Sequence, residues 1–292
     1  MSNPMLRADR FGSGAAPPET WPGGARPGWG SPGHGQPPPV PPAPDTVSPW
    51  PPAGSGTEET LRRRGVASAT AVLLAIIVAT GLVGWNVVDV VTSTNAAGKT
   101  VAESVSIPPW IFGAVIVGFV LAIITFVKPN LARITGPLYA VAEGLFIGAI
   151  SKVYEAQYTG IVLQAVGLTI GVFLLMLVLF ATGRIRVTPK LTAGIAVATG
   201  AVFLVYAASF VLSLFGSGVP YIHDSGPIGI GFSVVVVGIA AFNLLIDFDF
   251  IDRAESAGAP RRMEWYAAFS LVVTLVWLYL ELLRLLGKLR SR

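Results

Sequence analysis

Two acidic side chains lie inside long apolar stretches of the sequence, where ionisable groups are rare. Glu143 lies within the stretch 135–154, and Asp247 lies near the end of the stretch 226–250. At the rise of an α-helix, Glu143 is about 12 Å from the nearer end of its stretch and Asp247 about 5 Å from the end of its own. A charge at membrane depth costs about 2.5–3.5 kcal/mol on insertion scales, so it must be paired, be neutralised or face a cavity. Glu143 and Asp247 are therefore the candidate ion-path or pH-sensing residues.

The patterns that enzymes need do not occur in the sequence. The histidines, His34 and His223, lie outside the apolar stretches, there is no cysteine, and no HExxH, GxSxG or phosphate-binding glycine motif occurs. Asp247 and Asp249 would lie on nearly opposite sides of a helix, so they could not act on one water molecule. We therefore expect no catalytic residue, no metal, no cofactor and no enzymatic activity.

The composition indicates that lipid surrounds most of the chain. Charged residues make up 12% of the sequence, hydrophobic residues make up 53%, and the mean hydropathy is +0.67. A soluble domain carries about 25% charged residues, which cover its water-facing surface. The excess of basic residues falls at the ends of apolar runs, which is typical of membrane topology signals and not of a nucleic-acid surface.

Several stretches have the length of about 20 apolar residues that a membrane-spanning helix needs. Alternating transmembrane strands cannot explain them, because runs such as 72–77 do not alternate. The sequence therefore predicts an all-α integral membrane protein, a bundle of seven transmembrane helices. The predicted spans are 66–91, 109–127, 135–154, 160–181, 191–215, 226–250 and 264–287.

A proline-rich segment precedes the first span. Residues 1–60 hold 15 of the 23 prolines and few apolar side chains. Such a segment cannot bury enough apolar surface to offset its conformational entropy, so we expect a disordered N-terminal tail followed by a membrane domain at residues 65–290. The tail is either a solvated segment or a docking segment for a proline-recognition domain.

Small and charged residues near the spans suggest further contacts. Gly144 and Gly148 form a GxxxG pair, which we interpret as packing within the bundle. Glu281 and Arg284 are three residues apart and are expected to form a local ion pair. Lys128 and Arg133 are expected near the same side of the membrane as the end of the stretch that carries Asp247. These two basic residues are topology signals first and candidate counter-charges to Asp247 second.

Three segments carry a family pattern: the glutamate-glycine segment 136–151, the acidic segment 243–252 and the closing segment 265–284. Together they resemble the bacterial branch of the Bax inhibitor-1-like family. The resemblance implies a seven-helix fold with the last helix near the centre, and a pH-sensitive calcium leak. In such relatives a carboxylate on helix six shares a proton with one on helix seven. Asp247 matches the first position, whereas Thr274, which cannot ionise, stands at the second.

Two functions of different classes are consistent with these residues. The first is a pH-sensitive calcium or cation leak, favoured by Glu143 and Asp247. The second is a non-conducting regulator that binds other membrane proteins in proteolysis or stress response, favoured by Thr274. The expected partners are the lipid bilayer, calcium ions and other membrane proteins, and no nucleic acid. The expected location is the cell membrane, crossed several times.

Basic residues predict the orientation, because they accumulate on the cytoplasmic side. A cytoplasmic N-terminus leaves only Lys99 and Lys152 in the outer loops. It places eleven basic residues inside: Arg62, Arg63, Arg64, Lys128, Arg133, Arg184, Arg186, Lys190, Arg253, Arg261 and Arg262.

We predict that residues 1–65 are cytoplasmic and that Arg292 is external. A reporter that is active only in the cytoplasm should be silent when fused after Arg292 and active when fused before the first span. Activity after Arg292 would mean that one span is not a full crossing or that the orientation is inverted.

Overall fold

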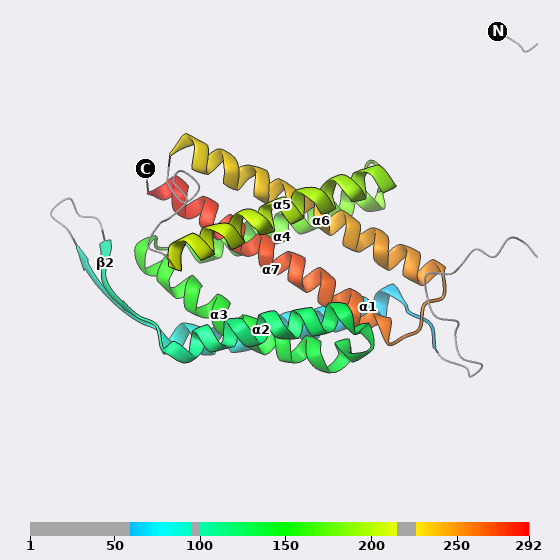
Figure 1. Cartoon of the computed structure of the whole chain (residues 1–292), viewed down its shortest axis with the longest axis horizontal. Coiled ribbons are helices and arrows are strands. Elements are labelled where there is room, and N and C mark those ends of the chain that lie inside the picture. The colour runs from blue at the N-terminus through cyan, green and yellow to red at the C-terminus, as the bar shows by residue number, and fades with distance from the viewer. Residues whose placement is uncertain (1–58, 95–99, 215–225, 292) are drawn as a thin grey trace, which may run out of the picture. The chain divides into compact units, whose positions relative to one another are not determined.

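The structure is a computed structural model that describes residues 59–94, 100–214 and 226–291. The predicted disordered tail therefore lies outside the described residues, except for Glu59 and Thr60. Figure 1 shows the arrangement of the helices.

Seven helices of the described residues are long and apolar enough to cross a membrane, which confirms the predicted all-α membrane fold. They are α1 (Arg63–Val87), α2 (Pro109–Val127), α3 (Ala132–Gln157), α4 (Ile161–Ala181), α5 (Pro189–Leu214), α6 (Pro227–Ser256) and α7 (Met263–Arg290). A short 3-10 helix, η2 (Pro129–Leu131), joins α2 to α3. The arginine-rich end of the bundle is where α1 and α7 begin, and the hairpin end is where they finish.

An antiparallel β-hairpin follows α1 and lies at the hairpin end of the bundle. Its strands are β1 (Asp89–Thr94) and β2 (Thr100–Ser106), and Val90 pairs with Val105. The predicted first span ran to residue 91, but the helix ends at Val87. The β-branched residues that follow favour a strand, and hydropathy alone could not separate them from the helix.

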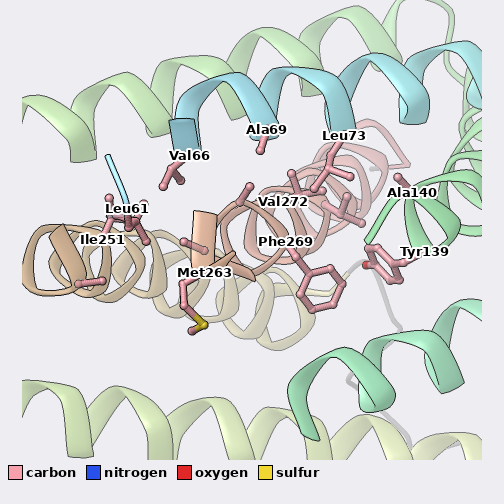
Figure 2. Packing of buried hydrophobic residues seen from close by; sticks show 14 of the residues in the cluster. Leu61, Val66, Ala69, Leu73, Tyr139, Ala140, Ile251, Met263, Phe269 and Val272 are labelled. Carbon is pink, nitrogen blue, oxygen red and sulfur yellow. The ribbon is translucent and has the colours of Figure 1, made fainter. Parts of the chain in front are cut away.

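The last helix, α7, is the most buried part of the bundle and packs against α1, α3, α4 and α6. Its residues Phe269 and Val272 meet Leu73 of α1 and Tyr139 of α3 (Figure 2). The rings of Phe269 and Tyr139 lie edge to face, with centroids 5.1 Å apart. This central position agrees with what the family resemblance implied for the closing helix.

Glycines bring α1 and α3 into close contact. A Cβ at Gly148 would overlap the carbonyl oxygen of Gly81 in α1, and a Cβ at Gly144 would overlap Thr80. Because lipid is as apolar as most side chains, helices in a membrane associate through such close packing. The GxxxG pair of α3 therefore packs within the bundle, as expected.

The chain segment before α1 is fastened to the loop between α6 and α7. The amide of Leu61 donates to the carbonyl of Ala259 at 2.7 Å, and the buried carboxylate of Glu264 accepts from the amide of Arg62 at 3.1 Å. Arg63 also pairs with Asp252. These contacts fix the start of α1 beside the end of α6.

We predict that Gly148→Leu destabilises the protein and that Gly171→Leu does not. The first side chain would be forced into the α1 backbone, and overpacking of this kind costs about 1–3 kcal/mol or more. A Cβ at Gly171 has nothing within 4 Å. Thermal unfolding in detergent would compare the two variants, and equal stability would contradict this account of the α1–α3 contact.

Candidate functional site

Asp247 lies on α6 and faces two hydroxyls of α7. Ser270 and Thr274 are four residues apart, so a helix presents them on one face. Ser270 Oγ donates to Asp247 Oδ1 at 2.6 Å, and Thr274 Oγ1 donates to Asp247 Oδ2 at 2.7 Å. The exposed fraction of Asp247 is 7%. Each oxygen of this buried carboxyl therefore has its own hydroxyl donor.

The Thr274 hydroxyl has two acceptors within reach. Besides Asp247 Oδ2, its oxygen lies 3.2 Å from the carbonyl oxygen of Ser270. A hydroxyl carries a single proton, so it donates fully to only one of them. When Asp247 is ionised the shorter bond to the carboxylate is favoured, and when Asp247 is protonated the hydroxyl can turn to the carbonyl. The arrangement can thus couple protonation to a change in the contact between α6 and α7.

Asp247 and Thr274 stand at the two positions that the family resemblance singled out, and they contact each other across α6 and α7. The contact joins a carboxyl to a hydroxyl, where relatives were expected to have two carboxylates. Ser270 is the residue that sequence reasoning missed. Its spacing of four residues from Thr274 was the available signal.

Glu143 lies on α3 and points toward α2. A Cβ at Gly118 of α2 would lie 3.5 Å from Oε2 of Glu143. Apart from the central α7, which both contact, α3 packs mainly against α1 and α2 whereas α6 packs mainly against α4 and α5. Glu143 and Asp247 therefore have different neighbours, and the structure does not bring the two carboxyls together. A path shared by both residues stays a prediction.

The two candidate counter-charges lie at the arginine-rich end. Lys128 directly follows α2 and Arg133 is in the first turn of α3, and both side chains are exposed. Among the described residues, no ion pair joins either of them to Asp247. The direct partners of Asp247 are hydroxyls.

A second polar cluster lies toward the hairpin end of α7. Arg284 Nη1 donates to Glu281 Oε1 at 2.9 Å, which confirms the expected local pair. The Tyr206 hydroxyl of α5 donates to the same carboxylate at 2.9 Å and accepts from Arg284 at 2.6 Å. Glu281 is 1% exposed. Tyr206 was not predicted, because a single tyrosine in an apolar span has no pattern that marks its partner.

A buried lysine joins α7 to α6 one turn further along. Lys288 Nζ donates to Ser233 Oγ at 2.9 Å and to the carbonyl of Gly229 at 3.0 Å. Lys288 therefore holds the hairpin ends of the two helices together.

One comparison with known proteins matches nearly the whole chain. The family model described as Bax inhibitor 1 like matches residues 17–291, which include every contact described above. The chain belongs to the Bax inhibitor 1 like family. No curated protein matches it.

Membership of this family confirms the resemblance seen in the three sequence segments. Asp247, Ser270 and Thr274 all fall within the matched residues. In this member of the Bax inhibitor 1 like family, one carboxyl of α6 and two hydroxyls of the central α7 form a polar contact between the two helices, in addition to the contact made by Lys288.

We predict that Arg284→Gln lowers the free energy of unfolding by about 3 kcal/mol, because it leaves the buried Glu281 charge without its cationic partner. The Glu281→Gln/Arg284→Gln double variant should recover most of this loss. Arg253→Gln is the matched control, since Arg253 is 60% exposed where it pairs with Asp249, and pairs near the surface contribute below about 1 kcal/mol. Equal losses for Arg284→Gln and Arg253→Gln would contradict the prediction.

Proposed function

We propose that this family member is a pH-sensitive cation leak that passes calcium, with Asp247 as its pH-sensing residue. The observation that carries the proposal is the buried Asp247 carboxyl held by Ser270 and Thr274. Ionisation places a negative charge at the α6–α7 contact, and protonation removes it. A charge at this depth is stable only if it is hydrogen-bonded, paired or hydrated. The site therefore responds to pH through both its charge and its hydrogen bonds.

Glu143 supplies a second carboxyl in this proposal. It lies on the α2 side of α3, so it would attract a cation beside α2 rather than beside α6. The basic residues Lys128 and Arg133 would make the electrostatic potential at the arginine-rich end more positive. Opposite charges at an entrance control which ions approach it.

A non-conducting regulator of other membrane proteins is the second candidate. The observation that favours it is the Thr274 hydroxyl in place of a second carboxylate. With one carboxyl at the α6–α7 contact, protonation could change helix packing without any ion passing. Such a protein would report pH to a partner in membrane proteolysis or stress response.

We place this protein in the cell membrane with its N-terminus in the cytoplasm. The basic residues at the arginine-rich end support this orientation. Asp247 would then lie near the cytoplasmic side, where its protonation follows cytoplasmic pH.

We predict that Thr274→Val moves the midpoint of the pH response of calcium flux upward by about one pH unit. A hydrogen bond to a charged group contributes about 1.5–3 kcal/mol, and about 1.4 kcal/mol corresponds to one pH unit. Removing the donor favours protonated Asp247, so a higher pH is needed to ionise it. Asp247→Asn should abolish this response. Flux of calcium into liposomes that hold the purified protein is the measurement.

Glu281→Gln is the control for the flux experiment, because Glu281 is paired with Arg284 away from the α6–α7 hydroxyls. Its flux should keep the wild-type midpoint. Glu143→Gln tests the second carboxyl separately. If wild-type protein conducts and Asp247→Asn keeps the full pH response, the site assignment fails. If wild-type protein conducts no cation at any pH, the regulator proposal replaces the leak.

A further inference from the structure

A long groove separates α1 from α4 and is not part of the Asp247 site. Its volume is about 880 Å³, and α1 and α4 form its two walls while α3, α6 and α7 close its base. The central part is lined by large apolar side chains: Leu74, Val78, Phe173, Leu177, Leu275 and Val276. The groove therefore reaches the buried central helix from the side of the bundle.

The few hydroxyls that line the groove are bonded within the protein. Thr70 donates to the carbonyl of Val66 at 2.9 Å, and Thr169 donates to the carbonyl of Ala165 at 2.7 Å. Ser151 and Tyr279 share a hydrogen bond of 2.7 Å. Water needs several polar partners to occupy a cavity, and apolar cavities stay dry. The groove is thus suited to an apolar occupant.

The direction of the groove matches the direction of lipid chains. Arg63 and Asp252 line it at the arginine-rich end and Trp85 lines it toward the hairpin end. From Arg63 to Trp85 the rise of α1 is about 33 Å, close to the hydrocarbon thickness of about 30 Å. Both walls are membrane-spanning helices, so the opening between them faces the hydrocarbon region. An acyl chain can enter it laterally and lie parallel to α1.

Exposed arginines lie near the groove at the arginine-rich end, and at the hairpin end the ammonium group of Lys152 lies over the ring of Trp85. Arg64 is exposed on α1, and Arg184 is exposed shortly after the end of α4. Arg63 itself is neutralised by Asp252 and Glu255. Arg64 directly follows the lining residue Arg63, and Arg184 comes three residues after the lining residue Ala181, so both put positive charge near this end of the groove, where a lipid headgroup would lie. Anionic lipids are attracted to such juxtamembrane basic residues.

We propose that the groove is a binding site for an anionic phospholipid. One acyl chain lies between α1 and α4 against the central helix, and the phosphate lies between Arg64 and Arg184. The α4 wall consists of large side chains such as Phe173 and Leu177, whereas helix–helix contacts in membranes favour small residues. The walls therefore fit a flexible chain better than a helix of another protein. The proposal is independent of the cation leak.

Retention of phosphatidylglycerol by the purified protein tests the site. Native mass spectrometry should show a bound phosphatidylglycerol on wild-type protein after exchange into detergent. Ala71→Trp should lose it, because Ala71 lines the groove. Ala79→Trp is the matched control, since Ala79 is exposed on α1 outside the groove and should keep the lipid. Equal retention by the two folded variants would overturn the proposal.

The headgroup is tested by the Arg64→Gln/Arg184→Gln variant. Its preference for phosphatidylglycerol over phosphatidylcholine should fall about 25-fold, from a contribution of about fivefold for each of the two basic residues. An unchanged preference would contradict the assignment of the headgroup to Arg64 and Arg184. The groove of this variant should still bind the acyl chain of either lipid.

Crosslinking of the wild-type chain decides the matter if Ala71→Trp does not fold. Phosphatidylglycerol with a photoreactive acyl chain should label groove residues such as Leu74 and Phe173 in preference to Leu163 and Val197. The latter two are 78% and 74% exposed outside the groove. Equal labelling of all four residues would indicate bulk lipid only. A co-purifying protein crosslinked to the groove would replace the lipid as the occupant of the groove. Both results would overturn the proposal.

Discussion

The absence of water inside a bilayer is the constraint on which this structure depends. Every polar group at membrane depth must find its partner within the protein. The central helix α7 meets this requirement along its whole length. Near its start Glu264 accepts from the amide of Arg62, in its middle Ser270 and Thr274 bind Asp247, and toward its end Arg284 pairs with Glu281. These bonds orient the helices around α7, because each polar group can be satisfied only in one arrangement of its neighbours.

Close packing between helices stabilises the rest of the bundle, and this packing is tighter for some helix pairs than for others. The α1–α3 pair is joined by glycine contacts such as Gly148 on Gly81, whereas Gly167 and Gly171 of α4 have open space beside them. The helix α4 contacts α7 and α6 but leaves a groove toward α1. The difference arises because α1 and α3 have glycines at matching depths.

The sequence predicted the spans well because length and hydropathy are properties of single helices. The family resemblance pointed to the positions of Asp247 and Thr274, because it carried information about two helices at once, but the hydrogen bond between them was not predicted. It could not predict whether Glu143 and Asp247 are neighbours, since that depends on which helices pack together. The β1–β2 hairpin was missed because Val90 and Val91 continue an apolar run. Tyr206 was missed because the neighbours of α5 are set by packing that its uniformly apolar sequence does not encode.

The family resemblance led us to expect a carboxylate at position 274, and the hydroxyl of Thr274 there changes the kind of pH response that the α6–α7 contact could have. Two adjacent carboxyls titrate as a coupled pair, with two apparent steps that belong to the pair. A carboxyl held by Ser270 and Thr274 exchanges a single proton, so its charge changes in one step. Neither hydroxyl can take up the charge that Asp247 loses. The hydrogen bond of Thr274 can instead pass to the Ser270 carbonyl within the same helix. Under the proposed function, the response of this contact to pH would be a rearrangement of donors on α7, with its amplitude set by one carboxyl.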